Sequence, residues 1–324
     1  MPQIPEFFSK LLAPGSATPL PTSLARLPSP AYVSMRGYAM ETVSRRMTAR
    51  AGLFAALFAL SCGNSSGEAG EAADEARAHA YVARLTGDGI VERFVEASAL
   101  FLGTDYAGGP LGEGEGATPD PDPRVDFDRS DCVTYLEQCL ALAVEPRFGA
   151  GRFLDALDAI RYRDGEVTFA ARNHYVVRDW IPANDWLVRD VTEEVGAART
   201  ERVTRTIDRA EFLREQGVEP RPGLDDARAA TISIVPSDSL AAVRGNLLSG
   251  DLLFWVGRKE GIFALHSGLV VHDARGDVRF RHASSSAGKV TDEPLLEYAE
   301  RSTFDRGVIV LRIRPDASPP GAGE

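Results

Sequence analysis

The sequence predicts an α+β domain in which a helix that carries a cysteine packs on an antiparallel β-sheet. A strongly helical run begins at Cys132, directly after polar residues that can cap a helix. Four short runs rich in β-branched and aromatic residues follow later, at 250–256, 263–272, 278–284 and 308–313. With 44% hydrophobic and 26% charged residues over 324 positions, the chain can bury a core of this kind without disulfide bonds.

The charge of the chain is unevenly distributed. Residues 1–61 carry six basic and two acidic residues, a net charge of +4, out of totals of 36 and 47. The remaining 30 basic and 45 acidic residues give −15. A domain this acidic is a poor match for a phosphate backbone, so we expect no nucleic-acid partner.

The N-terminal segment has the layout of a secretory signal. Two arginines at 45–46 precede a short apolar run and a small residue at 61, which predicts a signal peptide over 40–61. Cys62 then occupies the position of a lipid-accepting cysteine, and a simply cleaved signal is the alternative. Residues 1–39 show no periodic pattern and are interpreted as an extension outside the fold. The chain is therefore predicted to be exported, and to contact a membrane solely through an N-terminal lipid anchor.

The domain itself is predicted to cover residues 77–314. A glycine-rich stretch, 62–76, predicts a flexible tether before it. Apolar spacing then indicates a helix to about Phe101, broken at 87–89, followed by an irregular loop at 103–123. The charged segment 195–228 is interpreted as a solvated helical face. The Pro/Gly/Ala-rich tail, 315–324, is predicted to be disordered.

Cys132 is the candidate nucleophile. It falls in the first turn of its helix, where unpaired backbone N–H groups and the positive end of the helix dipole favour a thiolate. Cys139 lies seven residues further along the same helix and is predicted to be a core residue.

Two histidines lie on neighbouring predicted strands. Across the turn at 273–277, His282 comes opposite His266 to within one or two positions. His282 can then bond one ring nitrogen of His266 and leave the other nitrogen to take a thiol proton. A helix-borne thiol with an oriented imidazole is the arrangement that nucleophilic acyl transfer requires.

The chain resembles the N-acetylmuramoyl-L-alanine amidase-like subfamily of the NlpC-type, papain-like cysteine hydrolases of bacterial cell walls, over about 240 residues. The segments that carry the resemblance are Phe101–Tyr106, Asp131–Glu137, Arg161–Gly165, Arg172–Tyr175, Asp179–Ile181, Gly250–Asp251, His266–Gly268 and His282–Ser285.

The resemblance implies a papain-like fold with Cys132 as nucleophile, His266 as general base and His282 as the orienting third residue. It also matches Tyr106 to a tyrosine beside the nucleophile, although Asp105 stands where the family often has Pro and a long insert separates Tyr106 from Cys132. The substrate-binding residues that the resemblance implies are Tyr106, Arg172, His174, Tyr175, Asp179 and Trp180. For the last four, a buried structural role is equally open. Arg172 is a candidate partner for a substrate carboxylate.

The implied substrate is peptidoglycan or a muropeptide, cut at the lactyl amide to L-Ala or at a D-Glu to diamino-acid bond, without a cofactor or metal. A zinc amidase with ligands from His266, His282 and His174 or Cys132 is one alternative. A non-catalytic wall-binding lipoprotein is the other.

Overall fold

The computed structural model describes residues 65–220, 227–302 and 305–320. The described residues from 67 onward belong to one compact unit. The segments 1–39 and 40–61 and the candidate lipidation site Cys62 lie outside the described residues, so their interpretation stays a prediction.

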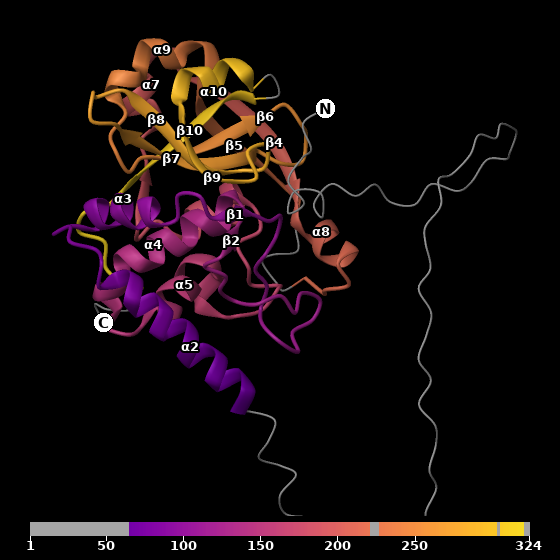
Figure 1. Ribbon diagram of the computed structural model, residues 1–324. Helices are drawn as coiled ribbons and strands as arrows, with labels where there is room; N and C mark the ends of the chain where they lie inside the picture. The colour runs from indigo at the N-terminus through magenta and orange to yellow at the C-terminus, as the bar shows by residue number, and fades with distance from the viewer. Residues whose placement is uncertain (1–64, 221–226, 303–304, 321–324) are drawn as a thin grey trace, which may run out of the picture. The chain divides into compact units, whose positions relative to one another are not determined.

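A mixed but mainly antiparallel sheet forms the centre of the domain (Figure 1). Its strands run in the order β2-β1-β9-β8-β7-β6-β10-β5-β4, with β3 pairing separately with β10, and the β1–β2 pair is parallel. The strands are β1 (Asp105–Tyr106), β2 (Arg129–Ser130), β3 (Val188–Asp190), β4 (Glu201–Asp208), β5 (Ala227–Pro236), β6 (Leu252–Gly257), β7 (Ala264–His272), β8 (Val278–Ser284), β9 (Lys289–Pro294) and β10 (Asp305–Ile313). The four predicted runs are β6, β7, β8 and β10, which confirms them.

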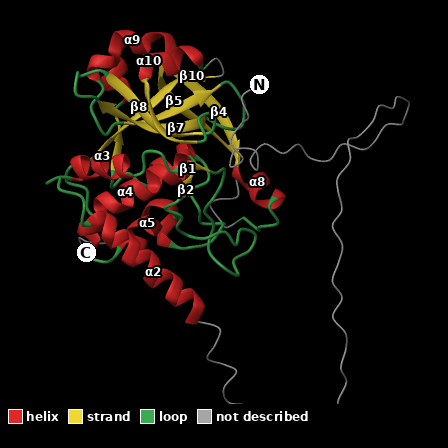
Figure 2. Ribbon diagram, viewed as in Figure 1, coloured by secondary structure: helices red, strands yellow, loops and turns green. Residues whose placement is uncertain are grey.

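Helices cover both faces of this sheet (Figure 2). One face packs against α3 (Ile90–Leu100), α4 (Cys132–Phe148) and α5 (Phe153–Arg161), and the other against α7 (Thr192–Gly196), α9 (Leu240–Val243) and α10 (Leu295–Arg301). The remaining helices are α2 (Ser65–Val82), α6 (Ile181–Ala183) and α8 (Arg209–Glu215), with short 3-10 or π turns at 163–165, 176–180, 197–199, 237–239 and 244–246. The α+β class is as predicted.

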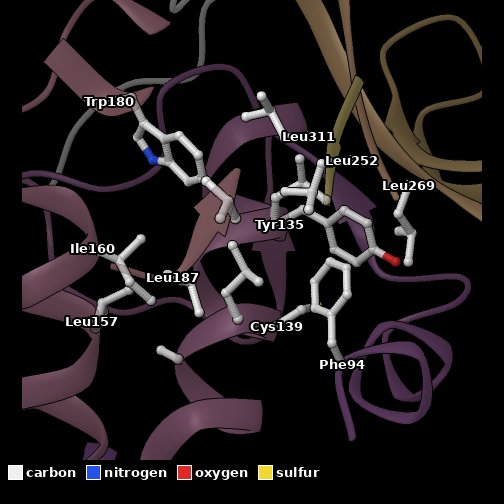
Figure 3. Packing of buried hydrophobic residues seen from close by; sticks show 14 of the residues in the cluster. Phe94, Tyr135, Cys139, Leu157, Ile160, Trp180, Leu187, Leu252, Leu269 and Leu311 are labelled. Atoms are coloured by element: carbon white, nitrogen blue, oxygen red, sulfur yellow. The ribbon is translucent and has the colours of Figure 1, made fainter. Parts of the chain in front are cut away.

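Strand β6 explains how two cores form around one sheet. All six of its residues are buried, with Phe254 in the core on the α4 side and Trp255 in the core on the α10 side. A strand buried on both faces is hydrophobic at every position, because successive side chains point to opposite faces. Figure 3 shows Cys139 inside the α4-side core, which confirms its predicted role.

The predicted tether is wrong over its described part. Residues 65–76 belong to α2, and Glu75 accepts hydrogen bonds from the backbone N–H groups of Phe153 at 3.1 Å and Leu154 at 2.7 Å. Its carboxylate therefore caps the start of α5, where the first N–H groups have no partner inside the helix. Composition alone does not reveal a cap supplied by a distant segment.

The predicted helix break at 87–89 is confirmed, since α2 ends at Val82 and α3 begins at Ile90. A Cβ at Gly87 would come within 2.5 Å of the Glu92 Cβ, so the close approach of the turn to α3 requires glycine there.

The helical interpretation of 195–228 is wrong at its centre. Residues 201–208 form β4, which pairs in antiparallel register with β5 from Glu201 opposite Ile234 to Asp208 opposite Ala227. Val203, Arg205 and Ile207 are buried while Thr204 and Thr206 are exposed. This period-2 pattern is typical of a strand, and it outweighs the charge pattern.

The predicted disorder of the C-terminal tail is wrong for its first residues. Ala317 is buried in the α4-side core, and its N–H donates to the Arg314 carbonyl at 3.1 Å.

Within the described parts of the chain, none of the helices combines the length and the hydropathy needed to cross a bilayer.

Candidate active site

Cys132 is the first residue of α4, and Asp131 caps that helix. The Asp131 Oδ1 accepts from the N–H groups of Val133 at 3.0 Å and Thr134 at 2.8 Å, while the Thr134 hydroxyl accepts from the Asp131 N–H at 3.0 Å. This reciprocal capping box fixes where the helix begins. The predicted position of Cys132 in the first turn is confirmed.

The loop before the cysteine folds back onto it, despite its length. Tyr106 on β1 pairs with Ser130 on β2, two residues before Cys132, and the Ala107 N–H donates to the Ser130 carbonyl at 3.1 Å. The Gly109 N–H donates to the other oxygen of Asp131 at 3.2 Å. The insert therefore leaves Tyr106 next to the start of the cysteine helix.

The electrostatics of Cys132 differ from the sequence prediction. Its side chain is 1% exposed, and burial, followed by the neighbouring charge of Asp131, raises the pKa of the thiol to about 12. Hydrogen bonding to Ser267 opposes this shift without cancelling it. The expected thiolate is thus not favoured, because burial and the negative charge of Asp131 both disfavour a second anion at this position.

His266 and His282 form the predicted pair. The Nε2 of His266 lies 2.6 Å from the Nδ1 of His282. Both rings pack in the α10-side core, with His282 stacked on Phe280 at 4.5 Å and His266 on Tyr298 at 5.9 Å between ring centroids. Burial, reinforced by His282, holds the pKa of His266 well below its usual value, so this imidazole is neutral near pH 7.

Two charged residues extend the pair, and the sequence interpretation missed both. The Nε2 of His282 lies 3.1 Å from an oxygen of Glu293 on β9, and the other Glu293 oxygen pairs with Arg301 on α10. The hydrogen bond to His282 lowers the pKa of Glu293 to about 2, which makes it a carboxylate at neutral pH. Strand β9 itself was not predicted, because its residues Lys289–Pro294 combine charges with proline and have weak β-propensity.

The start of α4 is linked through Ser267 to the strand that carries His266. The Ser267 hydroxyl donates to the Cys132 carbonyl at 2.9 Å, and Ser267 is the chain neighbour of His266. Among the residues that the structure describes, no hydrogen bond joins the Cys132 Sγ to the His266 ring. The Ser267 side chain faces α4, whereas the His266 ring packs on the α10 side of the sheet, so the thiol and this imidazole would have to approach each other for direct proton transfer.

The predicted substrate residues between Arg172 and Trp180 are buried, and Arg172, Asp179 and Trp180 have partners within the protein. Arg172 contacts Glu113 and Asp120 of the long loop, with the Asp120 oxygen at 3.0 Å. Asp179 accepts from Arg209 at 2.8 Å, and the Trp180 Nε1 donates to Glu137 on α4 at 3.1 Å. Arg172 and Asp179 thus have charged partners inside the protein, and Trp180 lies in the core (Figure 3).

These contacts hold the segment 173–177 along a hollow beside the start of α4. The hollow is lined by Val133, which follows Cys132, by His174 and Tyr175, and by Ile262. Ile262 also packs directly on Cys132. The walls of the hollow are mainly apolar, and its volume is about 440 Å³ with the solvent at its mouth included. Two of the predicted substrate-binding residues therefore border the cysteine helix.

The zinc alternative depends on whether its ligands converge. His174 bonds the Phe169 carbonyl through Nε2 at 2.7 Å, in a different part of the domain from the His266–His282 pair. Across the described ranges, no group of three or more His, Cys, Asp and Glu side chains is arranged to hold a metal ion.

Comparisons with known proteins place this site in a family context. A family model described as N-acetylmuramoyl-L-alanine amidase-like matches residues 96–307, which include Cys132, His266 and His282. No curated protein matches the sequence.

Solved structures share the fold at low sequence identity. A protein from Legionella pneumophila superposes with a TM-score of 0.67 and 22% identity, covering 78% of this chain and 98% of that one. An N-acetylmuramoyl-L-alanine amidase from Bacteroides uniformis gives a TM-score of 0.56 and 23% identity, covering 69% of this chain and 99% of that one.

Proposed function

The chain belongs to the N-acetylmuramoyl-L-alanine amidase-like family, and on this premise we propose that it hydrolyses an amide bond of peptidoglycan through the Cys132 thiol. The observation that carries the proposal is the buried Cys132 at the start of α4, whose carbonyl accepts a hydrogen bond from Ser267 on β7, the strand that also carries the hydrogen-bonded His266. The family and the name of the Bacteroides uniformis relative favour the amide between muramic acid and L-Ala.

The proposed reaction begins from a neutral thiol and a neutral imidazole. The Cys132 proton moves to His266 as the sulfur attacks the amide carbonyl, and an S–C bond forms. The Cys132 backbone N–H, at the helix start, donates to the developing oxyanion. The C–N bond then breaks as the imidazolium returns its proton to the leaving amine. Water, deprotonated by the same imidazole, hydrolyses the thioester and restores the thiol.

We propose that the hollow beside Val133 receives a small aliphatic part of the substrate. Its apolar walls suit a methyl group such as that of an alanyl or lactyl unit, while the His174 and Tyr175 side chains face the same space. We assign Arg172, Asp179 and Trp180 the role of holding this segment against α4, since their partners lie within the protein.

We further propose that the protein acts outside the cytoplasm. This rests on the signal-like segment 40–61 and on Cys62 as the lipid-accepting residue. Peptidoglycan is the amide-rich polymer that an exported bacterial hydrolase meets.

The test is digestion of purified muropeptides, with the products identified by mass. We expect release of free stem peptide, and we expect Cys132→Ala to lower the rate at least about 1,000-fold because the covalent route is lost. Cys139→Ala is the matched control, since it removes a second buried cysteine from the same helix without touching the site.

Other outcomes identify the alternatives. Cleavage between stem residues would make the protein an endopeptidase. Activity that a chelator abolishes and Cys132→Ala spares would favour the zinc mechanism. Tight wall binding by a chain that yields no product would favour the non-catalytic lipoprotein.

A further inference from the structure

We propose that Glu293 is a positioning residue that sets the proton positions on both histidines and so makes the Nδ1 of His266 the basic atom of the site. This inference rests on the proposed function, because it assigns the atom that would take the thiol proton. The inference adds Glu293 to a site for which the sequence analysis named Cys132, His266 and His282.

The first step is the direction of the outermost hydrogen bond. Glu293 is a carboxylate at neutral pH and can therefore accept hydrogen bonds but not donate them. The His282 Nε2, 3.1 Å from the Glu293 oxygen, must carry the hydrogen. Burial lowers the pKa of His282 despite this partner, so the ring holds one proton near pH 7 and its Nδ1 is an acceptor.

The second step follows from the contact between the two rings. With the His282 Nδ1 as acceptor, the His266 Nε2 at 2.6 Å must donate. A neutral His266 protonated at Nε2 presents a lone pair at Nδ1. Within the described residues, Nδ1 of His266 makes no hydrogen bond, so this atom can accept a proton.

The third step is what holds Glu293 in place. Register pairs it with Phe280 on β8, and Arg301 from α10 binds its second oxygen. The other titratable groups that face the pair are Tyr298 on α10 and the more distant charge of Asp292 on β9. Glu293 is therefore the anion in contact with the histidine pair, and its orientation is fixed from two elements.

The neighbouring residue Asp292 provides a matched control. It forms a bidentate pair with Arg281 at 2.7 and 2.8 Å, and Arg281 also bonds Ser98 of α3. Asp292 thus makes the same kind of ion pair, from the same strand, on the side of the sheet that faces α3. Asp292→Asn reports what losing a β9 ion pair does to the fold alone.

The test that does not depend on activity is nitrogen NMR of the imidazole rings in the full-length chain. We expect both neutral histidines to be protonated at Nε2 in the wild type and in Asp292→Asn, and Glu293→Gln to give mixed proton positions. Protonation of His266 at Nδ1 in the wild type, or identical spectra in Glu293→Gln, would overturn the inference.

The kinetic test uses the muropeptide assay. We expect Glu293→Gln to lower kcat about tenfold or more with little change in KM, as loss of an orienting carboxylate does elsewhere. The carboxylate favours the protonated pair, so its loss should move the acidic limb of the pH profile to lower pH. Glu293→Asp should recover part of the rate.

The two proposals fail separately. A wild type that cleaves no muropeptide, yet shows the expected proton positions and their loss in Glu293→Gln, would refute the proposed function and leave this inference standing. A wild type that cleaves, with Glu293→Gln matching Asp292→Asn in rate and pH profile, would refute the inference.

Discussion

At Cys132, burial decides the protonation state. A cysteine at a helix start is ordinarily expected to be a reactive thiolate. Here burial, followed by the neighbouring charge of Asp131, raises the pKa of the thiol to about 12. Burial also lowers the pKa of His266, so the thiol and this imidazole are both neutral near pH 7. In the proposed mechanism, proton transfer from the thiol therefore accompanies attack on the amide.

This protonation state predicts the pH dependence of thiol modification. With a thiol pKa of about 12, the thiolate fraction rises about tenfold per pH unit below that value, and the rate of alkylation follows it. We expect the iodoacetamide reaction of Cys132, followed by mass spectrometry of its peptide, to increase steadily from pH 7 to pH 9. A plateau below pH 7 would show a thiolate–imidazolium pair instead.

Among the secondary-structure elements and loops, the β6–β7 loop, residues 258–263, covers the Cys132 thiol. Ile262 from this loop packs on Cys132. Arg205, buried on β4, donates to the carbonyls of Ile262 and Gly257, the latter at 2.5 Å, and so ties the loop at both ends. Strand β4, which the sequence analysis assigned to a helix, thus holds the loop that covers Cys132.

Opening this cover should speed modification of Cys132. We expect Ile262→Ala to raise the iodoacetamide rate at pH 8 several-fold, because the thiol gains access to solvent and its pKa falls as burial is relieved. Lys259→Ala, on an exposed position of the same loop, is the control and should react like the wild type. Equal rates in both variants would mean that Ile262 does not limit access.

For the whole molecule, the segment before the first sheet strand is part of the fold. Helix α2 is joined to the rest of the domain by the Glu75 cap on α5, by the Arg77–Asp128 pair at 3.1 Å and by buried Ala78. A tether that simply spaced the domain from a membrane would make none of these contacts.

Removing the α2 contact should therefore destabilise the domain. We expect Glu75→Ala to lower the free energy of unfolding by about 1–2 kcal/mol, the usual cost of losing a helix cap. Denaturant unfolding measures it, and His79→Ala, an exposed position on the same helix, is the control. Equal free energies of unfolding for the two variants would mean that the Glu75 contact does not stabilise the domain.

Much of the site could be predicted from local patterns. The start of α4 at Cys132 follows from a capping residue beside an apolar run, and β6, β7 and β8 follow from their β-branched and aromatic residues. The approach of His266 to His282 follows from a short turn between adjacent strands. Each of these features depends on residues close together in the sequence, and such interactions leave a readable pattern.

The structure alone decided what depends on residues far apart. Glu293 joins the histidines through β9, Arg205 reaches the β6–β7 loop over more than fifty residues, and Glu75 caps a helix that begins at Phe153. The neutral state of Cys132 was also decided there, because a pKa depends on burial, and burial is a property of the packed domain. The sequence determined which groups could react, and the tertiary structure determined their protonation, their partners and their access to solvent.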